Sequence, residues 1–255
     1  MSINTNSNGY VMAFAIGVCV VMSSLLALTA TALKPAQDAA AEADRQKNVM
    51  IAAGVVAAED VLSVAEVQKR FGERVQEVVV DTRSGQVVDG KSAADVAALN
   101  KAAVKEAPAD KAASTRYRVV AKTKSADGKI ESIILPISGK GLWSTIYGYL
   151  ALDGDLTHVR GVTFYKHGET PGLGGECENP TWCAQWKGKS ILDAQQKLVG
   201  IGVKKGKVDP AIPAEKAHKV DGLSGATITS NGITKFVLAD LQVFDSYLTA
   251  LRKGS

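Results

Sequence analysis

The 255-residue sequence is poor in aromatic residues and histidine, and each shortage argues against a class of function. Phe, Trp and Tyr make up 5% of the chain, and 30 lysines and arginines are scattered among 26 acidic residues. Because no basic stripe with interleaved aromatics is found, nucleic-acid binding is not predicted. His158, His167 and His218 are dispersed, which argues against a histidine-based triad or metal site.

The three cysteines are too few to form a disulfide scaffold. Cys19 lies in a long apolar run, where it packs as a small hydrophobic residue. Cys177 and Cys183 have five residues between them, which leaves two ordinary thiols or one local disulfide open. A metal pair is disfavoured because no second pair of ligands follows at zinc-site spacing.

Charge is absent from the 24 residues between Tyr10 and Leu33. A helix of this length crosses a hydrocarbon core of roughly 30 Å with some tilt. The segment Ala30-Thr31-Ala32 resembles a signal-peptide cleavage site, but the preceding residues carry no Lys or Arg and the apolar run is too long. We therefore predict an uncleaved transmembrane helix over residues 10–33.

The charges beside this helix give a weak topology signal. Lys34, Arg45 and Lys47 follow the apolar run and no Lys or Arg precedes it. By itself this asymmetry favours a C-terminal body that faces the cytoplasm. Pro35 is expected to end or kink the helix, because proline lacks the N–H that the helix needs.

Residues 34–114 are predicted to connect the membrane helix to the functional domain. Residues 37–71 have apolar spacing typical of a helix. The stretch "RVQEVVVDTRSGQVVDG" predicts a β-hairpin around Ser84-Gly85. The Ala- and Lys-rich residues 91–114 are interpreted as a solvated surface insertion.

Residues 115–255 are predicted to form the functional domain. β-branched residues on both sides of Asp127-Gly128 predict another hairpin, and all three tryptophans fall in this part. We expect an α+β fold in which antiparallel strands pack with helices.

Several familiar motifs are incomplete. "GKGLWS" is not a phosphate loop, because Lys140 is followed by Gly141 rather than by Ser or Thr. It is also a poor dinucleotide-binding fingerprint, because no βαβ pattern surrounds it. The order Gly222-Leu223-Ser224-Gly225 lacks the second spacer of a nucleophile elbow.

Three glycine-containing stretches remain as candidates for a site. They are "SGKGLWSTIYGYLALD", "HGETPGLGGE" and "DGLSGATITS", the last of which ends at Ser230. A helix is predicted directly after it from apolar residues at helical spacing, with Thr229 or Ser230 as the N-cap. The plain interpretation is a capped helix. The same geometry also favours an anion, because free N–H groups and the helix dipole attract a phosphate.

The motif "DGLSGAT", together with "HGETPGLGGE", "GKGLWS" and the N-terminal span, resembles the C subunit of the sodium-translocating NADH:quinone oxidoreductases. The G subunit of the Rnf complex shares these motifs and is the near alternative. In this family a flavin transferase joins FMN through a phosphoester to the last threonine of the motif.

The resemblance implies that Thr227 bears the FMN. It implies that Asp221, Ser224, Gly225 and Ala226 are read by the transferase and then cradle the phosphate. The residues that it implies line the flavin are Glu169, Thr170, Leu173, Leu142, Trp143, Ser144 and Thr145. No side chain is then a catalytic acid, base or nucleophile, because the cofactor carries the chemistry.

The resemblance further implies a bacterial inner-membrane subunit that relays electrons in a sodium pump with subunits A, B, D, E and F. It places the flavin domain on the periplasmic side, against the weak charge signal. Two other classes remain: a membrane-tethered protein that binds an anionic ligand without redox chemistry, and an anchored hydrolase that uses Ser224.

Overall fold

The computed structural model describes residues 7–110, 112–124 and 130–253. The chain divides into two units, residues 1–45 and 46–255. The first unit consists of most of α1 (Asn8–Ala52), an apolar helix with a mean hydropathy of 2.5 over its best window. Over the described residues it is the one helix that is long and apolar enough to span a membrane.

Of the two outcomes predicted at Pro35, an end or a kink, the first is wrong: the helix continues through Pro35 to Ala52. A proline removes a single N–H from the helical ladder, and the alanine-rich turns after it have a high helix propensity. The turn after Ala52 ends the helix: Gly54 has a φ of 68°, which permits a left-handed turn, and the N–H of Val55 donates back to the carbonyl of Met50.

The prediction of one helical region over residues 37–71 was therefore wrong between residues 53 and 63. A new helix, α2 (Val64–Arg74), begins after Ser63. Ser63 and Glu66 form a reciprocal capping box, with the Ser63 N–H donating to Glu66 at 2.9 Å.

The second unit contains a six-stranded antiparallel sheet in the order β2-β1-β3-β4-β5-β6. Its strands are β1 (Val75–Asp81), β2 (Gln86–Val87), β3 (Tyr117–Lys124), β4 (Ile130–Lys140), β5 (Thr145–Asp153) and β6 (Val159–Lys166). The first predicted hairpin is confirmed by the pairing of Asp81 with Gln86. The turn of the second, around Asp127-Gly128, lies outside the described residues.

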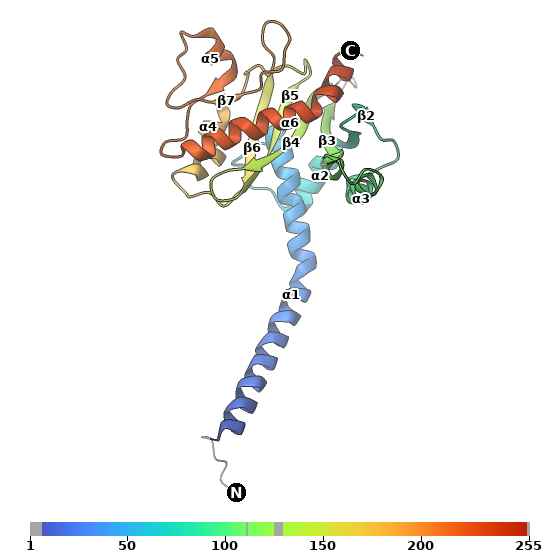
Figure 1. Ribbon diagram of the computed structural model, residues 1–255, viewed down its shortest axis with the longest axis vertical. Coiled ribbons are helices and arrows are strands. Elements are labelled where there is room, and N and C mark those ends of the chain that lie inside the picture. The colour runs from blue at the N-terminus through green and yellow to red at the C-terminus, as the bar shows by residue number, and fades with distance from the viewer. Residues whose placement is uncertain (1–6, 111, 125–129, 254–255) are drawn as a thin grey trace. The chain divides into compact units, whose positions relative to one another are not determined.

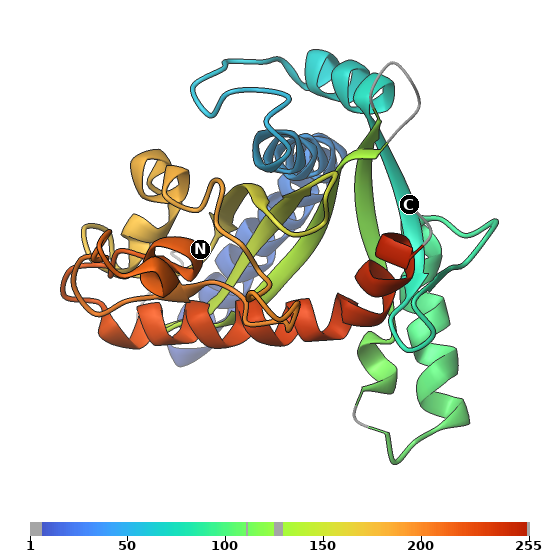
Figure 2. The same cartoon turned by 90° about the horizontal axis from the view of Figure 1, so that it is seen from above.

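Shorter elements connect and flank the sheet. They are α3 (Val96–Glu106), α4 (Pro180–Ala184), α5 (Pro213–His218), the parallel pair β7 (Gly202–Val203) and β8 (Lys219–Val220), and 3₁₀ turns at Ala93–Asp95, Ala113–Thr115 and Gly174–Glu178. The long helix α6 (Thr227–Lys253) follows them and lies along one face of the sheet (Figures 1 and 2). The α+β class is thus confirmed.

The core lies between α6 and the sheet. The apolar positions predicted for this helix are buried at Ile233, Phe236, Val237, Leu241, Phe244 and Leu248. They pack with one face of the central strands, including Leu135 on β4 and Leu150 on β5, which are paired across the strands. Full burial of each such side chain stabilises the fold by about 1.5–3 kcal/mol. This packing fixes the position of the first turn of α6.

Gly139 lets α6 approach the sheet closely. A Cβ at this position would lie 2.2 Å from the Cβ of Phe236. No other residue type fits there without a shift of the helix.

Candidate functional site

Thr227 is the first residue of α6, and its side chain is exposed. Gly225 has a φ of 68° and Ala226 is buried, so the chain turns sharply into the helix without a bulky side chain in front of Thr227. The first helical hydrogen bond runs from the N–H of Ser230 to the carbonyl of Ala226. The N–H groups before it therefore have no acceptor within the helix and favour an anion.

The predicted N-caps were wrong by a few residues. Thr229 and Ser230 lie inside the first turn and are buried. Ser230 instead accepts a hydrogen bond from the N–H of Leu223 (3.3 Å), and Thr229 donates to a carboxylate. The Ser230 hydroxyl therefore stabilises the segment before the helix and the Thr229 hydroxyl joins the helix to Glu169, and neither caps the helix start.

Asp221 anchors the segment from its other end. Its Oδ1 accepts a hydrogen bond from the N–H of Val208 at 2.7 Å, and its carbonyl accepts one from Nε1 of Trp182 at 2.8 Å. Its own N–H donates to Oε1 of Gln185 at 3.0 Å. The shape of residues 221–227 thus depends on contacts with two other parts of the chain, the α4 region and the loop at Val208.

Glu169 joins two of the glycine-rich stretches to α6. Its buried carboxylate accepts hydrogen bonds from the N–H groups of Leu142 (3.2 Å), Trp143 (2.9 Å) and Ser144 (3.3 Å). It also accepts one from the hydroxyl of Thr229 at 2.5 Å. These contacts make Glu169 a structural acceptor for the loop 142–144.

The charge on Glu169 is stabilised by these donors. Burial raises the pKa of Glu169, but the hydrogen bonds from Thr229 and from the loop N–H groups outweigh it and hold the pKa below its ordinary value of 4.5. Gly141 and Gly174 leave room for the carboxylate, since a Cβ at either would lie within 2.7 Å of one of its oxygens.

Four apolar side chains close to this network are exposed. Trp143 has 70% of its surface exposed, and the others are Leu142, Leu173 and Ile228. Leu173 lies beside Gly225, where an added Cβ would be 2.8 Å from its Cδ2. Exposed apolar groups of this kind are typical of a ligand-binding surface.

The remaining predicted residues have mixed surroundings. Ser144 accepts a hydrogen bond from the N–H of Gly168 at 2.6 Å, so it links the same two loops as Glu169. The carbonyl of Thr170 accepts from Leu173 and Gly175 and shapes the glycine-rich turn. Thr145 pairs with Lys140 at the start of β5, and Ser224 is exposed on the wall of a cavity.

That cavity has a volume of about 450 Å³ and is lined by Thr227 together with residues that the sequence analysis did not single out. These are Lys204, Lys205, Gly206 and Lys207, on the loop after β7. A Lys- and Gly-rich loop is ordinarily interpreted as solvated surface. The loop lines the same cavity as Thr227 because it folds against residues 220–222, and this contact cannot be read from the sequence.

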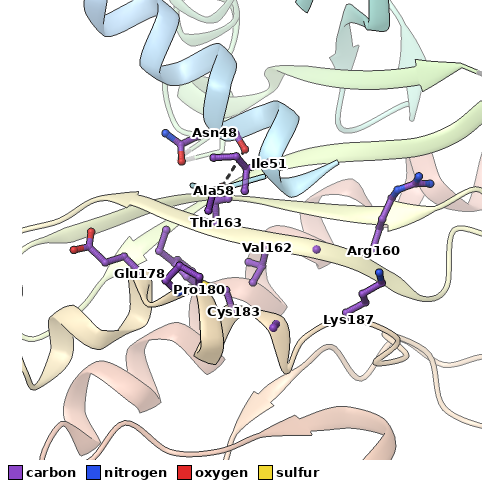
Figure 3. Close-up of a pocket in the computed structure, with 13 residues that line it drawn as sticks. Asn48, Ile51, Ala58, Arg160, Val162, Thr163, Glu178, Pro180, Cys183 and Lys187 are labelled. Atoms are coloured by element: carbon purple, nitrogen blue, oxygen red, sulfur yellow. Dashed lines mark hydrogen bonds between the residues drawn. The ribbon is translucent and has the colours of Figure 1, made fainter. Parts of the chain in front are cut away.

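A second cavity, of about 240 Å³, lies along the edge of the sheet at β6 (Figure 3). Five consecutive residues, 160–164, line it. Side chains of a strand alternate between the two faces of the sheet, so consecutive residues line one cavity where that cavity runs along an outer strand such as β6. Cys183 and Lys187 line it from the other side, and no residue predicted to bind the flavin does so. Asp221, Ser224, Gly225 and Thr227 line the larger cavity, whereas Ala226, Glu169, Thr170, Leu173 and residues 142–145 are not among its lining residues.

The comparisons with known proteins identify the domain that contains these residues. A family model described as an FMN-binding domain matches residues 141–242, which include the two loops joined by Glu169 and the first turns of α6. Fold and site together define an FMN-binding domain that follows a helix able to span a membrane.

The chain belongs to the family of the C subunit of the Na⁺-translocating NADH-quinone reductase. It is 42% identical to this subunit from Pseudomonas aeruginosa over 98% of each chain, and 36% identical to that of Yersinia pestis over 99% of this chain and 96% of the relative. A crystal structure of Shewanella oneidensis NqrC is 32% identical, with a TM-score of 0.67 over 85% of this chain and all of that one.

Proposed function

We propose that Thr227 holds FMN through a phosphoester and that this flavin relays electrons within a sodium-translocating NADH-quinone reductase. The observation that carries the proposal is the position of Thr227. It is an exposed hydroxyl at the start of a helix, inside a matched FMN-binding domain, with Gly225 and Ala226 directly before it.

The surroundings of Thr227 fit both ends of such a cofactor. The N–H groups of the first turn of α6 stabilise the negative charge of a phosphate beside the hydroxyl. The exposed side chains of Leu142, Trp143 and Leu173 provide an apolar surface for a flavin ring. When bound, FMN supplies the electron-transfer chemistry, and the protein positions it and tunes its potential.

The proposal extends to maturation, partners and location. A flavin transferase attaches the FMN, and the chain functions with subunits A, B, D, E and F in the bacterial inner membrane. The FMN domain faces the periplasm. Lys34 and Arg45, which argued for the other orientation, are paired with Asp38 (3.2 Å) and Glu42 (2.7 Å). Because the charge signal counts Lys and Arg and acidic partners change it little, the periplasmic orientation rests on the family resemblance.

Intact mass spectrometry tests the attachment. The chain co-expressed with a flavin transferase should gain the mass of one FMN less one water, because the threonine hydroxyl replaces a hydroxyl on phosphorus. Thr227→Ala should gain nothing, and Thr227→Ser, which keeps a hydroxyl, tests whether the acceptor atom is sufficient. An equal gain in the wild type and Thr227→Ala would refute Thr227 as the attachment site.

A labelling experiment tests the orientation separately. Cys177 is fully buried and unsuitable as a probe site, so a cysteine is introduced on exposed α3 by Ala102→Cys. A membrane-impermeant maleimide should label it in intact spheroplasts. Labelling only after permeabilisation would show that the domain faces the cytoplasm.

A further inference from the structure

The loop that faces Thr227 across the larger cavity is a fixed part of the fold. It follows β7, and the N–H of Lys204 donates to the carbonyl of Val220 at 2.9 Å. Further along, the carbonyl of Gly206 accepts from the N–H of Gly222 at 2.7 Å. The N–H of Val208 then donates to the carboxylate of Asp221, also at 2.7 Å. Three hydrogen bonds thus join residues 204–208 to residues 220–222.

The two segments also approach each other closely. A Cβ at Gly222 would lie 2.3 Å from the carbonyl oxygen of Lys204. The first glycine of the "DGLSGAT" motif is therefore needed for contact with residues 204–207, which we call the lysine loop, and not only for access to the threonine. Residues of both segments line the same cavity.

The charges on this loop are divided between two roles. The Nζ atom of Lys204 is paired with Glu215, which lies on α5. Lys205 and Lys207 are exposed, and within the described part of the chain no carboxylate is paired with either. Asp221 is the one acidic residue that lines the cavity, and its Oδ1 accepts the N–H of Val208. The cavity therefore has an excess of positive charge.

We propose that Lys205 and Lys207 form a phosphate-binding wall of the Thr227 cavity and take the phosphate of a phosphorylated ligand. Lysine binds phosphate as a point charge, and two lysines on one short loop can reach the same anion from one side. The identity of that ligand as a flavin phosphate rests on the proposed function. The assignment of the two lysines rests on the cavity itself.

Binding of free flavins to the full-length chain tests this inference. The chain is purified in detergent from a host without a flavin transferase, so that Thr227 is unmodified, and is titrated with FMN, riboflavin and inorganic phosphate. The double variant Lys205→Ala/Lys207→Ala should bind FMN at least about tenfold more weakly, since each lysine contributes a charge-assisted contact. Riboflavin, which lacks the phosphate, should bind equally to both proteins.

Salt and a matched variant serve as controls. Raising the salt to about 0.5 M should weaken FMN binding to the wild type more than to the double variant, because exposed charges are screened. Lys101→Ala/Lys105→Ala removes the same charge from α3 and should leave FMN binding unchanged. Inorganic phosphate should displace FMN from the wild type. An inhibition constant for phosphate well above the Kd of FMN would assign the site to the phosphorylated flavin rather than to free phosphate.

Three results would overturn the inference. The first is an FMN affinity of the double variant within twofold of the wild type, and the second is no saturable FMN binding to the wild type. The third is a loss of riboflavin binding equal to the loss of FMN binding, which would assign the effect to a change of fold rather than to a phosphate contact. Failure of the proposed function gives a different result. If the chain binds FMN through these lysines but gains no FMN mass with the transferase, the phosphate site is supported and the covalent attachment is refuted.

Discussion

The hydroxyl of Thr229 donates a 2.5 Å hydrogen bond to Oε2 of Glu169, and the two residues are 60 positions apart in sequence. The same carboxylate accepts the N–H groups of loop 142–144. A single buried acid therefore connects the first turn of α6, which begins with Thr227, to the loop that exposes Trp143. The geometry around the proposed flavin depends on this one group.

Replacement of Glu169 by glutamine should destabilise the domain. Glu169→Gln keeps the volume but exchanges one acceptor oxygen for an NH₂ group that faces N–H donors. Hydrogen bonds to a charged group contribute about 1.5–3 kcal/mol each, so we expect a loss of about 2–3 kcal/mol and a Tm lower by about 4–12 °C. Thermal unfolding measures it, with exposed Glu73→Gln as the control. Equal Tm values for the two variants would contradict the structural role of Glu169.

The stabilisation from Glu169 should depend on pH in one direction. Because the folded pKa of Glu169 is lowered from 4.5, its contribution is present above that value and is lost as pH falls through the folded pKa. The difference in Tm between the wild type and Glu169→Gln should be constant near neutral pH and shrink in acid below 4.5. A difference that grows on acidification would contradict the sign of the shift.

The ion pair between buried Asp240 and partly buried Arg118 should couple α6 to the sheet. Asp240 accepts hydrogen bonds from Nη1 of Arg118 at 3.0 Å and from the N–H of Ser138 at 2.7 Å. Burial raises the pKa of Asp240 above its usual 3.8, against the lowering effect of both partners. Removal of one member of a fully buried pair costs about 3–5 kcal/mol, and the partial exposure of Arg118 lowers this cost here.

A double-mutant cycle measures this coupling. Asp240→Ala should lower the free energy of unfolding by several kcal/mol, and Arg118→Met combined with it should restore part of that loss. Denaturant unfolding gives each value. Strictly additive effects of the two substitutions would show that the pair is not coupled.

Gly225 should matter for flavin attachment beyond its backbone conformation. Gly225→Ala and Gly90→Ala introduce a Cβ at nearly the same φ, 68° and 69°. The Cβ at 225 would contact Leu173, whereas nothing lies within 4 Å at 90. Both variants should lose a similar roughly 1–2 kcal/mol of stability from strain. Only Gly225→Ala should slow the gain of FMN mass, and equal attachment rates in the two variants would refute the contact.

The thiols of Cys177 and Cys183 should be unreactive in the folded domain. Burial raises the pKa of both to about 12, and Sγ of Cys183 donates to the carbonyl of Cys177 at 3.2 Å. Since the thiolate is the nucleophile, iodoacetamide near pH 8 should leave both unmodified. In a Cys19→Ser background, mass spectrometry should show two adducts after denaturation. A mass lower by two hydrogens with no adduct would instead reveal a disulfide.

Local patterns predicted the elements but not the contacts between them. The apolar spacing after Thr227 predicted α6, and the turn at Ser84-Gly85 predicted the first hairpin. The helix start was misplaced because two hydroxyls with N-cap preference turn inward to other partners. The role of Glu169 could not be predicted, because its donors are encoded 25–27 and 60 residues away.

The lysine loop shows the same limit. Lys205 and Lys207 are exposed, and nothing in a Lys- and Gly-rich stretch distinguishes a ligand contact from a solvated turn. Their proposed role in binding rests on the backbone hydrogen bonds between their loop and residues 220–222, which sequence spacing does not reveal.

The residue boundaries 10–33, 34–114 and 115–255 stay predictions for the domain organisation.

The burial of α6 against the sheet also sets an order of events during biosynthesis. The apolar helix α1 emerges from the ribosome early, whereas the sheet has no cover on its α6 face until Leu248 has been made. Thr227 is held in its turn by loops that depend on this cover. Under the proposed function, the flavin transferase therefore acts after α6 has been made and packed, and cofactor loading follows folding.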